Sequence, residues 1–172
     1  MKKLFSMLLS CAVGSLVLLS AQYSVAASDS PQAYPLAPAF SGETLRGKPL
    51  KFTPRNSSSI NSDQPTLLVF WASWCGVCMT EVPALKTAFA ERADQLQIIG
   101  INLDKTPSKG LAVVQERQLP YPSVKDGDLL IADQYEVSGT PTLYVIGASG
   151  NILYRANRLH KALAFIDNME PR

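Results

Sequence analysis

The sequence contains few of the side chains that hold metal ions or build networks of disulfides. It has three cysteines and one histidine, His160, among 172 residues. Cys75 and Cys78 stand in one motif, and Cys11 lies in an apolar stretch near the start. A structural zinc site needs four ligands, so this count argues against one. Cys75 and Cys78 can pair only with each other, and His160 is expected on the surface rather than as a catalytic base.

The sequence also has no excess of one charge. It contains 16 Lys and Arg residues against 14 Asp and Glu residues, and Lys2 and Lys3 fall in the leader described below. The rest of the chain is therefore balanced, which argues against nucleic acid or an anionic membrane as its partner. No internal repeat is visible, and no predicted helix has an apolar outer surface that requires a second copy. We therefore expect a monomer.

The longest apolar run is at the start of the chain. Met1–Lys3 is positively charged, residues 4–19 are almost wholly apolar, and residues 24–27, Ser-Val-Ala-Ala, end in small side chains. This order predicts a signal peptide at residues 1–27 that directs the protein to the periplasm. An uncleaved membrane anchor is the alternative, although the run is slightly short for a spanning helix. Residues 28–39 are expected to be a flexible lead-in, and residues 40–172 one domain.

The strongest chemical signal lies between Thr66 and Pro83. Its first part, Leu67 to Trp71, is a short apolar run of the kind that forms a strand buried on both faces of a sheet. After Cys78, apolar side chains recur at helical spacing: Val82, Leu85, Phe89 and Ala93. The sequence therefore predicts a buried strand that delivers a Cys-x-x-Cys pair to the first turn of a helix.

That position suits a reactive thiol. Unpaired backbone N–H groups and the helix dipole stabilise an anion there, so we expect the Cys75 thiol to have a lowered pKa. Cys78, one turn later, is expected to lie beneath it, shielded from solvent. Attack by Cys75 on a disulfide gives a mixed disulfide, which Cys78 resolves. Val77, unlike a proline, has a backbone N–H that can donate to the Cys75 sulfur and make the pair more oxidising.

The rest of the domain alternates strands and helices. A hairpin is expected over residues 40–52, where Pro49 limits the second strand to an edge. The further elements predicted are a strand at Leu96–Leu103, helices at Gly110–Leu119 and Asp128–Tyr135, a hairpin of Thr142–Ile146 and Asn151–Tyr154, and a helix at Ala162–Met169. This order predicts an α/β fold with a mixed sheet flanked by helices.

Three features together resemble the thioredoxin superfamily. They are Trp74-Cys75-Gly76-Val77-Cys78, Pro83 in the following helix, and Gly139-Thr140-Pro141 before a late hairpin. The chain is more narrowly similar to the exported TlpA/ResA/CcmG (DsbE) group. The shared features are the leader, the early hairpin, the extra residues before the proline loop, and Glu81 three positions after Cys78.

This resemblance implies a thioredoxin fold with an N-terminal β-hairpin and an insertion before a cis-proline loop. It implies that Pro141 is the cis-proline beside the disulfide and that Thr140 offers backbone groups to an extended peptide. Trp74, Gly76 and Val77 are then expected to contribute to the same substrate-binding surface.

One departure concerns proton transfer. Thioredoxins proper have a buried aspartate six residues before the first cysteine, where this chain has Val69. Proton handling then falls to Glu81 or to water. Glu81 is one helical turn beyond Cys78, so it is placed to approach the site and accept the Cys78 proton. A solvated helix glutamate is the alternative.

The predicted function is that of a periplasmic thiol–disulfide oxidoreductase with no cofactor beyond its redox-active disulfide. The resemblance implies the reducing direction, client proteins as substrates, and a membrane electron donor of DsbD type. A DsbA-like oxidant is the rival within this class. A Cu(I)-binding module built on Cys75 and Cys78 is a rival from another class, although the chain lacks a Met or His run. A peroxidase is disfavoured because the two cysteines share one motif.

Overall fold

The computed structural model describes residues 34–54 and 64–169. The chain divides into two units, residues 1–32 and 33–172, and every described residue belongs to the second. The predicted signal peptide and the first part of the lead-in therefore lie outside the described residues. Within the described ranges, no helix is both long and apolar enough to cross a bilayer.

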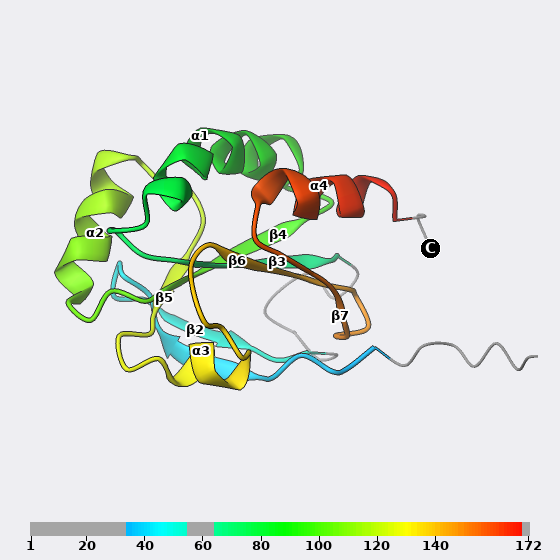
Figure 1. The fold of residues 1–172 in the computed structure, drawn as a ribbon, viewed down its shortest axis with the longest axis horizontal. Helices are drawn as coiled ribbons and strands as arrows, with labels where there is room; N and C mark the ends of the chain where they lie inside the picture. Colours follow the sequence, from blue (N-terminus) through cyan, green and yellow to red (C-terminus); the bar gives the residue numbers. More distant parts are fainter. Residues whose placement is uncertain (1–33, 55–63, 170–172) are drawn as a thin grey trace, which may run out of the picture. The chain divides into compact units, whose positions relative to one another are not determined.

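A five-stranded mixed sheet forms the centre of the second unit, in the order β5-β4-β3-β6-β7 (Figure 1). The strands are β3 (Thr66–Trp71), β4 (Gln97–Asn102), β5 (Ser123–Lys125), β6 (Thr142–Ile146) and β7 (Ile152–Ala156). β3 runs parallel to β4, which runs parallel to β5, whereas β6 is antiparallel to both β3 and β7. All six residues of β3 are buried, as the unbroken apolar run predicts for a central strand.

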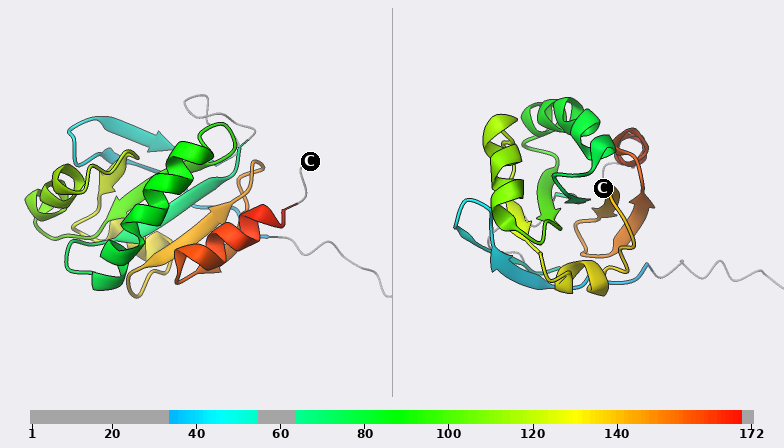
Figure 2. Two further views of the ribbon diagram at one scale, coloured as in Figure 1. Left: turned by 90° about the horizontal axis from the view of Figure 1, so that it is seen from above. Right: turned by 60° about the vertical axis from the view of Figure 1, so that its left-hand side comes forward.

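Helices cover both faces of this sheet. Three helices, α1 (Gly76–Glu91), α2 (Pro107–Glu116) and α4 (Leu159–Asp167), lie over one face, and α3 (Leu130–Gln134) lies over the other (Figures 1 and 2). Alternate residues of β3 supply the two cores. Val69 belongs to the cluster that contains residues of α1, α2 and α4, and Phe70 to the cluster that contains residues of α3.

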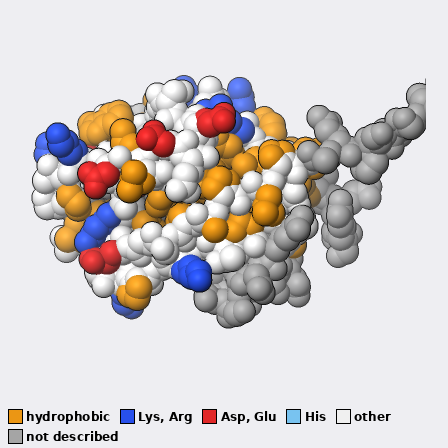
Figure 3. Space-filling view, turned by 90° about the horizontal axis from the view of Figure 1, so that it is seen from below, with side chains coloured by type: hydrophobic (Ala, Val, Ile, Leu, Met, Phe, Trp, Pro, Cys, Tyr) orange, Lys and Arg blue, Asp and Glu red, His pale blue; other side chains and the backbone are white. Residues whose placement is uncertain are grey.

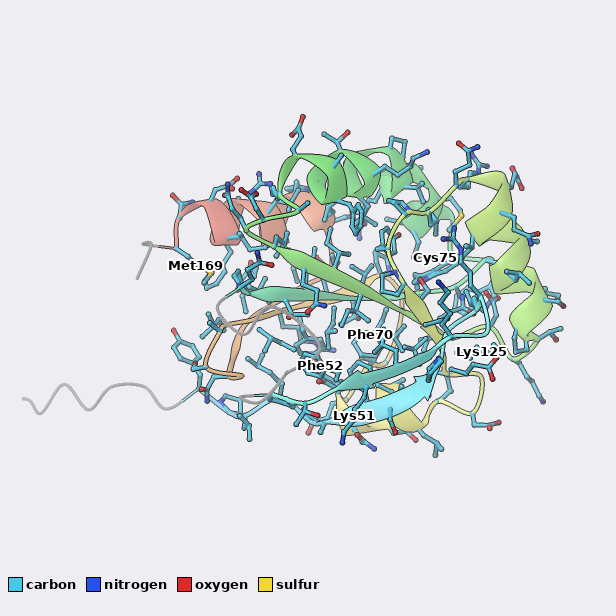
Figure 4. The ribbon with its side chains drawn as sticks, turned by 180° about the vertical axis from the view of Figure 1, so that it is seen from behind. Lys51, Phe52, Phe70, Cys75, Lys125 and Met169 are labelled. Atoms are coloured by element: carbon cyan, nitrogen blue, oxygen red, sulfur yellow. A yellow bond between two sulfur atoms is a disulfide. The ribbon has the colours of Figure 1, made fainter. Side chains whose placement is uncertain are left out.

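The predicted early hairpin is confirmed and lies on the same face as α3. Strands β1 (Phe40–Glu43) and β2 (Pro49–Phe52) pair with each other, and Pro49 opens the second strand as expected. Phe40 stacks on Phe52, and both belong to the core cluster of Phe70, which Figure 4 labels near Phe52. Figure 3 shows the outer surface of this face, where charged side chains of both signs are scattered among apolar ones.

The described end of the lead-in contacts the domain. Leu36 forms a β-bridge with Asn151, the N–H of Ala37 donates to the carbonyl of Gly150, and the Tyr135 hydroxyl donates to the carbonyl of Pro38. These contacts place residues 36–38 against the β6–β7 turn and α3. The contacts of the folded unit therefore begin ahead of Phe40.

Most elements lie close to the predicted ranges, with three differences. α2 spans Pro107–Glu116, so it begins and ends three residues before the predicted helix Gly110–Leu119. β5, at Ser123–Lys125, was not predicted from the sequence, because three residues after two prolines carry no periodic pattern. It forms because Ser123 to Lys125 pair with Gly100 to Asn102 of β4. The last helix begins at Leu159, three residues before the predicted start.

Candidate active site

The two cysteines lie where β3 passes into α1. Cys75 is the N-cap residue of α1, with an extended backbone, and the helix begins at Gly76. The loop between the two elements is held by the N–H of Cys75, which donates to the carbonyl of Ala72. Figure 4 labels Cys75 at the start of the helix. The predicted arrangement of strand, Cys-x-x-Cys pair and helix is thus present.

Cys75 and Cys78 are joined as a disulfide, with their Cα atoms 5.2 Å apart. The Sγ of Cys75 accepts a hydrogen bond of 3.1 Å from the N–H of Cys78. The sequence led us to expect Val77 as this donor. An N-cap side chain can accept from the N–H of the second or the third helical residue, and here the donor is the third, Cys78. The fixed N–H group and the helix dipole both favour negative charge on the Cys75 sulfur.

The side chains around the disulfide differ in exposure. Cys75 and Cys78 are each 5% exposed, so the expected difference between an accessible and a shielded cysteine is absent in the disulfide form. Trp74 is 68% exposed and Val77 37% exposed, and Gly76 is also at the surface. The three predicted surface residues therefore surround a nearly buried sulfur pair.

The proline loop lies at the same end of the sheet. The Thr140–Pro141 peptide bond is cis, as the resemblance implies. Thr142 pairs with Phe70, the penultimate residue of β3, so Pro141 stands beside the end of the strand that leads into the Cys75 loop. Pro141 is buried, Thr140 is half-buried, and the Thr142 hydroxyl donates to the carbonyl of Gly139 within the loop.

Glu81 lies one turn beyond Cys78 and is half-buried. Its Oε1 accepts a hydrogen bond of 3.0 Å from the N–H of Leu159, the first residue of α4. The carboxylate therefore satisfies one of the unpaired N–H groups at the start of α4 and ties α4 to α1. His160, in the same first turn of α4, is exposed as expected.

A buried carboxylate that no sequence motif singles out, Asp104, holds the loop before Cys75. Asp104 is 2% exposed and accepts hydrogen bonds from the N–H of Ser73 (2.9 Å), the hydroxyl of Ser73 (2.6 Å) and Nδ2 of Asn102 (2.8 Å). Val69, where thioredoxins proper have their aspartate, is buried and apolar in the core. Asp104 follows β4, and its position near the Cys75 loop becomes apparent only once β3 and β4 are known to be adjacent parallel strands.

No group of three or more His, Cys, Asp or Glu side chains within residues 34–54 and 64–169 is arranged as a set of metal ligands.

Comparison with known proteins places this site in a family. A model of the AhpC/TSA family matches residues 36–155. The chain belongs to the AhpC/TSA family. Its curated relatives include thioredoxin-like protein YneN of Bacillus subtilis, 32% identical over 119 residues that make up 67% of this chain and 66% of YneN. Thiol-disulfide oxidoreductase ResA of Oceanobacillus iheyensis is 31% identical over 87 residues, 50% of this chain and 45% of ResA. The chain thus spans about half to two thirds of these relatives.

Among solved structures, a thiol-disulfide oxidoreductase from Bacteroides fragilis has 27% sequence identity and a TM-score of 0.64. The match covers 76% of this chain and 98% of that one. The predicted thioredoxin fold and the predicted resemblance to the TlpA/ResA/CcmG group are both confirmed. Within the AhpC/TSA family, this chain is similar to proteins named as thiol–disulfide oxidoreductases, and it carries its cysteine pair as a disulfide.

Proposed function

We propose that this protein is a thiol–disulfide oxidoreductase that reduces disulfides of client proteins through Cys75 and Cys78. The observation that carries the proposal is the disulfide at the N-terminus of α1, where the N–H of Cys78 donates to the Cys75 sulfur. A thiol at such a position has a lowered pKa and attacks as a thiolate near neutral pH. The exposed Trp74 beside the pair supports contact with a protein-sized substrate.

The proposed reaction passes two electrons from the protein to the client. The Cys75 thiolate attacks one sulfur of the client disulfide, which forms a mixed disulfide and releases the other client sulfur as a thiolate. The Cys78 thiol then loses its proton and attacks Cys75 Sγ, which restores the Cys75–Cys78 disulfide and releases the second client thiolate. Glu81 or water accepts the Cys78 proton, and Thr140 holds the client backbone in extended form.

The direction of exchange follows from the reduction potential. We propose a reductase, re-reduced by a membrane electron donor of DsbD type, and a working site in the periplasm after export by the leader. The rival, a DsbA-like oxidant, requires a potential near about −120 mV, whereas reducing members of the superfamily lie near about −270 mV. Equilibration of the Cys75–Cys78 pair with glutathione measures this value. A potential close to that of the strong oxidants would reverse the proposed direction.

The test of the exchange itself is to trap the mixed disulfide. In the Cys78→Ala variant, Cys75 can attack a client but the complex cannot be resolved, so client proteins should remain covalently attached in cells. The Cys75→Ala variant is the matched control, because it keeps Cys78 and loses the attacking thiol. If both variants capture the same proteins in the same amounts, Cys75 is not the nucleophile.

The Cu(I)-binding alternative makes a different prediction. A metal-binding module takes up one Cu(I) per Cys75–Cys78 pair and does not reduce insulin disulfides, whereas the proposed reductase does reduce them. Insulin reduction by the reduced protein, compared with its Cys75→Ala variant, therefore separates the two functions.

A further inference from the structure

A groove adjoins the proposed active site on the side away from α2. Its volume is about 580 Å³, and it runs between the proline loop, residues 138–142, and the segment 154–158 with Lys161. Two contacts link this groove to the cysteine pair. First, Pro141 stands beside the end of β3 because Thr142 pairs with Phe70. Second, the carboxylate of Glu81 in α1 accepts a hydrogen bond from the N–H of Leu159, next to the groove. A client that lies across the proline loop therefore meets this groove.

The groove is positively charged. Arg155, Arg158 and Lys161 line it and are exposed, and no Asp or Glu is among the described residues that line it. None of these three cations lies in an ion pair with a carboxylate of residues 34–54 or 64–169. The charge is therefore available to a partner.

The surroundings of each cation decide which of them can respond to a partner. Arg155 donates to the carbonyl of Glu136 (3.2 Å) and lies 5.7 Å from the centre of the Tyr144 ring, so it is held in place with an acidic residue nearby. Among the described residues, Arg158 donates only to the carbonyl of Asn157, its neighbour in sequence (2.7 Å).

Glu81 is the acidic residue on the α1 side, and its Oε1 is engaged by the N–H of Leu159. Arg158 and Lys161 are thus the cations best placed to pair with an incoming carboxylate.

We propose that this groove binds an acidic segment of the client protein and so selects clients with Asp or Glu close to the disulfide that Cys75 attacks. The inference rests on the function proposed above. Complementary charge at the rim of a binding surface acts mainly on the association rate and on the choice of partner. Because Arg158 and Lys161 are exposed, the effect is expected to be a preference of a few-fold that added salt weakens.

Three peptides that share one internal disulfide test this proposal. They carry either two Glu, two Gln or two Lys residues beside one cysteine and are otherwise identical. Reduced wild-type protein should reduce the Glu peptide with a kcat/KM roughly fivefold above that of the Gln peptide, and the Lys peptide should be the slowest. High salt should bring the three values together.

Charge reversal in the groove provides the decisive comparison. The Arg158→Glu/Lys161→Glu double variant should invert the order, so that the Lys peptide becomes the fastest. A variant that is only less stable would slow all three peptides alike. The Lys48→Glu/Lys51→Glu double variant is the matched control, because it changes the net charge equally and both lysines are exposed on the β1–β2 hairpin. This hairpin, where Figure 4 labels Lys51, lies on the other side of the sheet from α4, so the control should keep the wild-type order.

The outcomes separate the two proposals. If wild-type protein reduces all three peptides equally, or the Arg158→Glu/Lys161→Glu variant keeps the wild-type order, the groove does not select acidic clients although the oxidoreductase function stands. If the wild-type protein reduces none of the peptides, the proposed function fails and the inference fails with it.

Discussion

Asp104 acts on the site through Ser73, two residues before Cys75. Its carboxylate accepts three hydrogen bonds, two of them from Ser73, in a position that water does not reach. A buried carboxylate with this many donors fixes the loop that presents Cys75 to a client. We therefore propose that Asp104 acts by positioning the loop before Cys75.

We predict that Asp104→Ala lowers the free energy of unfolding of the oxidised protein by about 3 kcal/mol, because the three donors lose a buried acceptor. Ser73→Ala is the matched control. It removes only the hydroxyl bond and should cost about 1 kcal/mol. Urea unfolding measures both changes. The alkylation rate of reduced Cys75 should change in Asp104→Ala, and equal stability losses in the two variants would contradict the anchoring role.

The residues that sequence reasoning located differ in kind from those it missed. Cys75, Cys78 and Pro141 belong to local motifs that can be read within a few positions. The position of Asp104 near the Cys75 loop depends on which strands are neighbours in the sheet. The position of Arg158 near the site depends on how the start of α4 packs beside the proline loop. Such residues become visible only when the register of β3, β4 and β6 is known.

The role of Glu81 depends on the contact between helices α1 and α4. Cys75 caps the N-terminus of α1 and Cys78 lies in its first turn. Glu81 of the same helix accepts a hydrogen bond from the N–H of Leu159, the first residue of α4, next to the basic groove. A carboxylate at a helix N-terminus is stabilised by the dipole and by the unpaired N–H groups. Glu81 thus has a structural role beside the proton transfer proposed for it.

Two substitutions separate these roles. Glu81→Ala should lower the free energy of unfolding by about 1 kcal/mol through loss of the cap on α4, whereas Glu81→Gln keeps an acceptor oxygen and should recover most of that loss. If Glu81 accepts the Cys78 proton, Glu81→Gln should also alter the pH profile of kcat/KM for client reduction. Glu91→Gln, at the exposed end of the same helix, is the control. A profile equal to that of the parent would leave Glu81 with the capping role alone.

Among the helices and strands, the sequence predicted those whose hydrophobic pattern lies within their own residues. β3 and α1 have an unbroken apolar run and a helical period, and their positions are confirmed. β5 and the α4 start were not predicted correctly, since both depend on tertiary contacts. Ser123 pairs with Gly100 of β4, and the N–H of Leu159 donates a hydrogen bond to the carboxylate of Glu81 in α1.

The described unit as a whole consists of two cores on either side of one sheet. One carboxylate on each face, buried Asp126 and exposed Asp167, has a shifted pKa. On the face of α3, Asp126 accepts hydrogen bonds from the N–H groups of Ile131 (3.0 Å) and Ala132 (2.8 Å). On the face of α1 and α4, Arg92 at the end of α1 pairs with Asp167 at the end of α4. Acid stability of the molecule depends on both.

Asp126 and Asp167 make the free energy of unfolding change with pH in opposite directions. Burial raises the pKa of Asp126 above its usual 3.8, although the N–H groups of Ile131 and Ala132 act against it. The folded state therefore binds this proton more readily than the unfolded state, and stability falls as pH rises from about 4 through the raised value. The Arg92 hydrogen bond lowers the pKa of Asp167, so its contribution is present above about 4 and is lost as pH falls below that value.

Urea unfolding between pH 3 and pH 7 tests this balance. Relative to Asp126→Asn, which cannot titrate, the wild-type protein should lose stability as pH rises above about 4, because its buried carboxylate becomes charged. Relative to Asp167→Asn, it should lose stability as pH falls below about 4, by less than about 1 kcal/mol because the Arg92 pair is exposed to solvent. Two difference curves of opposite slope are therefore expected. A flat curve for Asp126→Asn would mean that the two hydrogen bonds from Ile131 and Ala132 offset the burial of its charge completely.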